Sequence, residues 1–290
     1  MECNFAVFPA PKYDHTNLFY FKEYLFFIPK KDSSNTTINI PCLYLQKQTN
    51  KDLPSPNFLI FFHGNAEDIF GAHAMAEALL KHVPMNIVIV EYPGYSAYNL
   101  PKSSSMIQKD AEYIYDYIKN KFNVNDNNMF IFGRSIGTGP AIYLASKRKP
   151  SALFVVSAFS SIVEVAKHLV KVLGAIVYDA FPSIDNVKNI TCPILFIHGL
   201  KDPLIPVEET IKLKNACNCP VEVILPPDMT HNDFNLKENI AKPIQNFLKK
   251  HCVIEEIKGN FIIDDKLLEL PIEIENEIKK MKQNAKNSRK

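Results

Sequence analysis

Short apolar runs alternate with longer segments of helical periodicity along most of this chain. Runs such as 58–62 (FLIFF) and 86–90 (NIVIV) contain almost no polar residue, which predicts strands buried on both faces. Between such runs, segments such as 103–122 place apolar residues three and four positions apart, as on one face of a helix. Strands that alternate with helices predict a mainly parallel sheet with right-handed crossovers and helices on both faces.

Two earlier apolar runs, 24–28 and 37–45, precede this series and are expected to add an antiparallel edge to the sheet. The sequence therefore predicts an α/β fold with a central sheet of about eight strands. The expected strands are 24–28, 37–45, 58–62, 86–90, 129–132, 152–156, 194–197 and 221–225, and the expected helices are 66–82, 103–122, 136–147, 162–173, 207–216 and 236–249.

A chain of 290 residues is long enough for one large α/β domain or for two smaller ones. The continuous series of strands and helices indicates one domain over residues 1–252. Within it, the segment 159–190 falls between two core strands and is expected to form a small cap over the site. Residues 253–290 are highly charged and end in a basic run, which predicts a partly helical C-terminal extension with a disordered basic end.

Charge and cysteine content exclude several classes of protein. The 33 basic and 31 acidic residues give a formal charge of +2, which is too balanced for a nucleic-acid-binding protein. The six cysteines are scattered, and Cys217 and Cys219 have the wrong spacing for a CxxC redox or zinc motif, so reduced thiols are expected. No apolar run reaches the ~18 residues of a membrane span, and the start lacks a secretory signal, so a cytoplasmic protein is expected.

A GxSxG motif, Gly133–Gly137, lies directly after an expected strand and directly before an expected helix. A sharp turn between strand and helix exposes the hydroxyl of the central serine at the carboxyl edge of the sheet. Glycines are needed on both sides because neighbouring side chains would clash there. Ser135 is therefore the predicted nucleophile, and it needs a base to accept its proton.

Candidates for the acid and the base follow in the chain order Ser, Asp, His that this strand–turn–helix motif requires. Asp202 follows the strand 194–197, and His231 follows the strand 221–225, so both lie at the same sheet edge as Ser135. His198 is interpreted as a structural residue. Asp228 and Asp233 flank His231 too closely in sequence to orient its imidazole, and Asp185 is expected to be a surface residue or a helix cap.

The strand 58–62 ends in the pair His63–Gly64. A turn of this type can supply a backbone N–H to an oxyanion, and Asn65 is assigned as that donor, with Ile136 as the second. The alternative is that His63 and Gly64 only shape the turn, and both interpretations can hold together. The motif Tyr92–Tyr95 forms another tight turn, whose tyrosines either line a substrate pocket or pack in the core.

Five motifs together resemble the alpha/beta-hydrolase domain protein 17 group, over roughly residues 20–250. Related branches with similar motifs include monoacylglycerol lipases and lysophospholipases. The motifs are HGNAED (63–68), YPGY (92–95), GRSIGTGPA (133–141), CPILFIHGLKD (192–202) and HND (231–233).

The resemblance implies an α/β-hydrolase fold, with Ser135 as nucleophile, Asp202 as acid, His231 as base, and Asn65 and Ile136 as oxyanion donors. Members of the group remove palmitate from cysteines of membrane-anchored proteins. This chain departs from the group's pattern in three places. Ser96 and Thr230 replace glycines, and Cys3 stands alone where the depalmitoylases carry an acylated cysteine cluster. One lipid chain gives only marginal, reversible attachment, so any membrane contact is expected to be peripheral.

The sequence therefore predicts a serine hydrolase that cleaves esters or thioesters through an acyl-enzyme, with no metal or organic cofactor. Its expected partner is an acylated protein, a lipid or a small ester, and no nucleic acid is expected. Two alternatives remain open. An acyltransferase would pass the acyl group to an alcohol, and a binding protein on the same fold would perform no chemistry.

Overall fold

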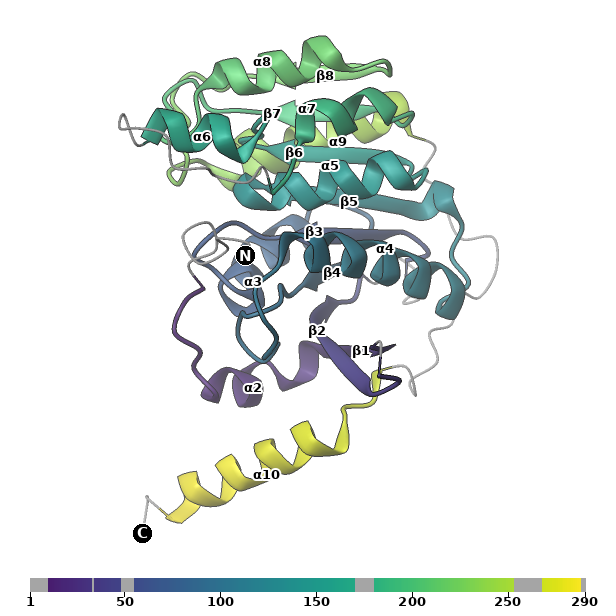
Figure 1. Cartoon of the computed structure of the whole chain (residues 1–290), viewed down its shortest axis with the longest axis vertical. Coiled ribbons are helices and arrows are strands. Elements are labelled where there is room, and N and C mark those ends of the chain that lie inside the picture. Colours follow the sequence, from purple (N-terminus) through teal and green to yellow (C-terminus); the bar gives the residue numbers. More distant parts are fainter. Residues whose placement is uncertain (1–9, 33, 48–54, 170–179, 253–267, 288–290) are drawn as a thin grey trace.

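The computed structural model describes residues 10–32, 34–47, 55–169, 180–252 and 268–287 (Figure 1). Cys3 lies outside the described residues, as do part of the expected cap (170–179), part of the expected extension (253–267) and the last residues of the basic run (288–290).

One sheet of eight strands forms the centre of the molecule, in the order β1-β2-β4-β3-β5-β6-β7-β8. Strand β2 pairs antiparallel with β1 and with β4, and all pairs from β4 to β8 are parallel. The prediction of a mainly parallel sheet with an antiparallel edge is confirmed. The strands are β1 (Leu25–Lys31), β2 (Thr37–Leu45), β3 (Phe58–Phe62), β4 (Asn86–Val90), β5 (Met129–Arg134), β6 (Ala152–Val156), β7 (Ile194–Ile197) and β8 (Val221–Ile224).

The apolar runs form strands because both faces of the sheet are covered. In β3, Phe58 and Ile60 pack into the core on one face, whereas Leu59 and Phe61 pack into the core on the other. All five side chains of this strand are at most 1% exposed. Because both faces of such a strand are buried, its sequence is apolar throughout. A strand with one face in solvent would instead alternate apolar and polar residues.

Helices cover the two faces in separate groups. Those on one face are α4, α5, α6, α7 and α8, and those on the other are α2, α3, α9 and α10. Their bounds are α2 (Thr16–Tyr20), α3 (Ile69–Leu80), α4 (Ser104–Lys121), α5 (Thr138–Lys147), α6 (Ile162–Leu169), α7 (Ser183–Asn186), α8 (Val207–Ala216), α9 (Lys242–His251) and α10 (Ile272–Asn287).

Capping side chains decide where several helices begin. The Asp68 carboxylate accepts from the Gly71 amide at 2.9 Å, so α3 begins at Ile69 and not at the expected position 66. Ser103 caps α4 in the same way through the Met106 amide at 3.3 Å. The expected helix 236–249 forms as a π-helical turn, Leu236–Ala241, that continues into α9.

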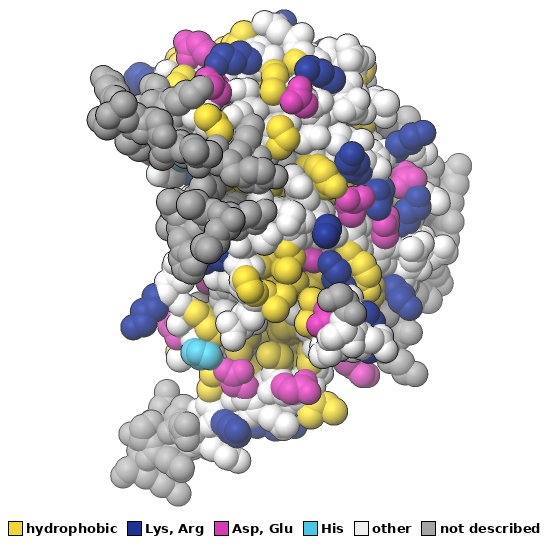
Figure 2. All heavy atoms as spheres, in the orientation of Figure 1, with side chains coloured by type: hydrophobic (Ala, Val, Ile, Leu, Met, Phe, Trp, Pro, Cys, Tyr) yellow, Lys and Arg dark blue, Asp and Glu magenta, His cyan; other side chains and the backbone are white. Residues whose placement is uncertain are grey.

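The C-terminal helix α10 packs against the N-terminal helix α2, beyond β1 and at the opposite end of the molecule from β8 (Figure 1). Ile278 of α10 is only 3% exposed, and His15 Nδ1 lies 2.8 Å from Glu277 Oε1. Acidic and basic side chains intermingle on the face in Figure 2, while hydrophobic ones gather near its centre. Within the described residues, no helix combines the length and apolar character needed to cross a bilayer.

Candidate active site

The turn between β5 and α5 holds Ser135 in a left-handed backbone conformation, with φ of 53°. A Cβ at Gly133 would lie 2.5 Å from the Gly137 carbonyl oxygen, and one at Gly137 would lie 2.3 Å from the Phe62 carbonyl oxygen. Neither position can carry a side chain without moving backbone. The two glycines therefore permit a tight turn that leaves the serine hydroxyl accessible. The backbone of this turn packs closely against the end of β3.

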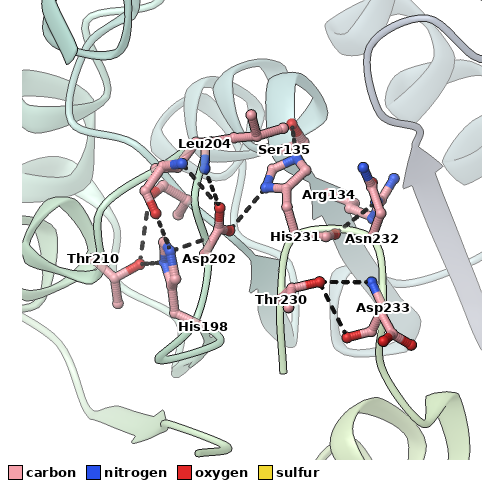
Figure 3. Close-up of polar contacts among 12 residues, drawn as sticks. Arg134, Ser135, His198, Asp202, Leu204, Thr210, Thr230, His231, Asn232 and Asp233 are labelled. Atoms are coloured by element: carbon pink, nitrogen blue, oxygen red, sulfur yellow. Dashed lines mark hydrogen bonds and ion pairs between the residues drawn. The ribbon is translucent and has the colours of Figure 1, made fainter. Parts of the chain in front are cut away.

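The structure brings the three predicted side chains into one hydrogen-bonded chain (Figure 3). His231 Nε2 lies 2.9 Å from Ser135 Oγ, and His231 Nδ1 lies 2.8 Å from Asp202 Oδ2. Ser135 is 8% exposed, His231 is 7% exposed and the Asp202 side chain is fully buried. The imidazole thus stands between a hydroxyl that can lose a proton and a carboxylate that can stabilise the resulting positive charge.

Asp202 is held by backbone amides as well as by the imidazole. Its Oδ1 accepts from the amides of Leu204 and Ile205, both at 2.9 Å, which leaves Oδ2 facing His231. Burial alone would raise the pKa of Asp202, but the hydrogen bonds from His231 and the two amides outweigh it and hold this pKa at about 2. The carboxylate is therefore ionised at neutral pH.

A close backbone contact joins the loops that carry the acid and the base. A Cβ at Gly199 would lie 2.1 Å from the Met229 carbonyl oxygen, so only glycine fits where the two loops cross. The same oxygen accepts from the Lys201 amide at 3.1 Å. These contacts fix the distance between Asp202 and His231 although 29 positions separate them in the chain.

His198 lies directly behind the acid, with Nε2 3.5 Å from Asp202 Oδ2. Its Nε2 donates to the Ile205 carbonyl at 2.9 Å, and its Nδ1 lies 2.7 Å from Thr210 Oγ1. Burial lowers the pKa of His198, which favours the neutral ring. The structural interpretation fits these contacts, since His198 braces the loop that carries Asp202 and has no contact with Ser135.

The two predicted oxyanion donors follow neighbouring parallel strands. Asn65 comes after β3 and Ile136 comes after β5, and the contact of Gly137 with Phe62 holds the two strand ends together. Ile136 is 7% exposed, and the Asn65 side chain accepts from the Tyr95 hydroxyl at 3.2 Å. The role of the two backbone N–H groups stays a prediction.

Below this loop, sequence analysis missed a buried ion pair between His63 and Glu91. His63 Nε2 lies 3.2 Å from Glu91 Oε1, His63 Nδ1 lies 2.9 Å from the Gly64 carbonyl, and both side chains are fully buried. Both ring nitrogens face acceptor oxygens, which favours the doubly protonated ring. Burial alone would lower the pKa of His63, but Glu91, with smaller contributions from Glu67 and the Gly64 carbonyl, outweighs it and raises this pKa. The sequence signal for this buried pair was Glu91, the acidic residue that directly follows the apolar run 86–90.

Glu91 also accepts from three groups besides His63: the amides of Ile69 and Tyr92 and the Ser96 hydroxyl. We expect Glu91→Ala to lower the free energy of unfolding by about 3–5 kcal/mol, because it leaves the buried His63 ring and three further donors without their acceptor. Urea denaturation measures this loss. Asp185→Ala is the control, since Asp185 forms only an exposed ion pair with Lys188 at 2.9 Å. If Glu91→Ala lowered the free energy of unfolding no more than the control does, the prediction would be contradicted.

Tyr92 and Tyr95, which were expected either to line a pocket or to pack, are 2% and 1% exposed. The Tyr92 hydroxyl donates to the His63 carbonyl at 2.8 Å, and the Tyr95 hydroxyl bonds to the Asn65 side chain. Both rings therefore brace the loop after β3, and contact with a substrate stays a prediction.

The other acidic candidates lie outside the triad. Asp228 is exposed and pairs with Lys201 at 2.6 Å, and the backbone of Asp233 bonds to Thr230 (Figure 3). Within the described part of the chain, no group of three or more His, Cys, Asp or Glu side chains is arranged to hold a metal ion.

The sheet order, the serine turn and the Ser–His–Asp contacts define the α/β-hydrolase fold. A solved esterase from Pyrococcus furiosus matches 84% of this chain and 98% of its own with a TM-score of 0.64, at 16% sequence identity, which supports the fold alone.

In sequence, the chain resembles the alpha/beta hydrolase domain-containing protein 17 group. The human protein 17B is 28% identical over 214 residues, which cover 74% of this chain and 72% of the relative. The Caenorhabditis elegans alpha/beta hydrolase domain-containing protein aho-3 is 30% identical over 199 residues, which cover 68% of this chain and 59% of that relative. No protein-family model matches the chain.

Proposed function

We propose that this α/β-hydrolase is a serine hydrolase that cleaves carboxylic esters or thioesters through an acyl-enzyme. The observation that carries the proposal is the unbroken contact from Asp202 through His231 to the strained Ser135, at 2.8 and 2.9 Å. A base within hydrogen-bond reach of the nucleophile, itself oriented by a third group, is the arrangement that nucleophilic catalysis requires.

In the proposed reaction, His231 Nε2 takes the Ser135 proton while Oγ bonds to the substrate carbonyl carbon. The amides of Asn65 and Ile136 would hold the negative oxygen, and Asp202 stabilises the imidazolium. His231 then gives its proton to the departing alcohol or thiol, which leaves an acyl-serine. A water molecule attacks this ester, loses its proton to His231, and releases the carboxylic acid and free Ser135.

Among such substrates, we favour long-chain acyl thioesters of proteins, which the resemblance to the protein 17 group implies, over lipid or small esters. Two of the few exposed large hydrophobic side chains, Leu200 and Leu204, flank Asp202 at 49% and 38% exposure. We propose these two leucines as the side chains that would contact the acyl chain of the substrate.

A substrate panel tests this choice. We expect kcat/KM to rise with acyl length along p-nitrophenyl esters and to be highest for a palmitoyl-thioester peptide, since each buried methylene contributes about 0.8 kcal/mol. Added alcohol acceptors separate hydrolysis from acyl transfer through the products formed. A preference for acetyl esters over all longer chains would contradict the thioesterase proposal, and failure of a fluorophosphonate probe to label Ser135 would contradict the serine mechanism.

A further inference from the structure

Arg134 lies between the glycine of β5 and the nucleophile, and its side chain reaches the loop that carries the base. We call residues 229–234 the base loop. Arg134 Nη2 donates to the His231 carbonyl at 2.9 Å and to Asn232 Oδ1 at 2.7 Å (Figure 3). The guanidinium also lies 5.7 Å from the centre of the Phe234 ring. Three residues of the base loop, His231, Asn232 and Phe234, therefore contact the side chain of the residue that directly precedes Ser135.

The other end of the guanidinium reaches the loop after β3, residues 63–68, which we call the oxyanion loop. Arg134 Nη1 lies 3.4 Å from Glu67 Oε1, and the same oxygen accepts from the Gly64 amide at 2.6 Å. A Cβ at position 64 would come within 2.8 Å of both Arg134 Nη1 and Glu67 Oε1. Glycine at this position therefore leaves room for the contact, and Glu67 fixes the amide next to that of Asn65.

We propose that Arg134 is a positioning residue that sets the base loop and the oxyanion loop at fixed distances from Ser135. The inference rests on the proposed function, because it concerns how well His231 and the oxyanion donors are aimed at the reacting carbonyl. Nucleophile, base and oxyanion donors come from three different strand ends, and Arg134 contacts all three segments.

A purely stabilising role differs from a positioning role in what it changes. The side chains of Arg134 and Glu67 are only 13% and 27% exposed, so their loss can lower the free energy of unfolding, but only a positioning role lowers the kcat of the folded enzyme. Geometry does require an arginine, because its rigid planar fork can hold two loops at once, whereas a lysine ammonium is a single point charge.

The test compares Arg134→Ala, Arg134→Lys and Glu67→Gln with the wild-type chain on the p-nitrophenyl ester that the wild type cleaves fastest. We expect Arg134→Ala to lower kcat by about 10–100-fold with little change in KM, because small misplacement of catalytic groups affects the transition state far more than substrate binding. Glu67→Gln keeps an acceptor for the Gly64 amide but loses the charge, so its fall in kcat should be smaller. Arg134→Lys should recover only part of the rate, and millimolar guanidinium should partly rescue Arg134→Ala.

Arg148→Ala is the matched control. Arg148 forms ion pairs with Glu112 and Asp116 at 2.8 and 2.6 Å on the far end of α5 and has no contact with the site. It should leave kcat unchanged. A kcat of Arg134→Ala within about twofold of wild type, or a loss confined to KM, overturns the proposal. If Arg134→Ala fails to fold, unchanged kcat in both Arg134→Lys and Glu67→Gln overturns it. Failure of the proposed function is distinct, because the wild-type chain would then neither hydrolyse esters nor react with a fluorophosphonate.

Discussion

Replacing Ser135 with alanine is expected to lower kcat by on the order of 10⁶-fold, because the three triad side chains act as a unit. In the proposed mechanism, Ser135 Oγ bonds to the substrate carbonyl carbon. Without the hydroxyl, His231 Nε2, which lies 2.9 Å from Oγ, has no proton to take. Ester hydrolysis in a preparation free of host esterases measures the effect. The residual rate reports what the oxyanion donors and substrate binding achieve without a nucleophile.

Non-additivity sharpens this prediction. The double variant Ser135→Ala/His231→Ala should be no slower than Ser135→Ala alone, since a base without a nucleophile contributes nothing further. Ser157→Ala is a close control, because Ser157 directly follows the neighbouring strand β6 with φ of 52° and its buried hydroxyl has no hydrogen-bond partner among the described residues. It should keep most of the wild-type activity. Substantial hydrolysis by Ser135→Ala would show that Ser135 is not the nucleophile, whether or not the fluorophosphonate probe labels that variant.

The strands were predictable because burial on both faces leaves a strong composition signal. The run 58–62 is apolar throughout and forms β3 as expected. Helix starts were less predictable, since the apolar pattern continues past the capping residue, and only the Asp68 side-chain contact with Gly71 decides where α3 begins. The packing of α10 on α2 had no signal in either segment, because it joins residues 262 positions apart, such as His15 and Glu277.

That Ser135, Asp202 and His231 lie together was predictable from motif and chain order, because the fold brings the ends of parallel strands to one edge. The residues that hold them were not. Arg134 meets Glu67 across 67 positions and Asn232 across 98, and no local pattern marks such contacts. His198 is a partial case. The structural interpretation fits its contacts, but sequence analysis did not anticipate that its Nε2 lies 3.5 Å from Oδ2 of Asp202, four positions along the same segment.

Replacing Asp202 with asparagine is expected to lower kcat by on the order of 10⁴-fold through the tautomer of His231. The amides of Leu204 and Ile205 both donate to Oδ1, so the carbonyl oxygen of the new amide must stay on their side. Its NH₂ group then faces His231 Nδ1, which must become an acceptor. The proton moves to Nε2, and the ring cannot accept the Ser135 proton. A loss of less than tenfold in kcat would contradict this orientation.

The same variant tests whether Asp202 contributes to folding. Its pKa is lowered from 3.8 to about 2 in the folded chain, which corresponds to about 2 kcal/mol of stability. Because the folded-state pKa is lowered, this contribution is present above the unfolded value and is lost as pH falls from about 4 to about 2. Urea denaturation should therefore find Asp202→Asn less stable than wild type at pH 7, by at most that amount, with the difference vanishing towards pH 2. A difference that stays constant across this range would mean that the carboxylate is not held by its hydrogen bonds, and the orientation argued for His231 would lose its physical basis.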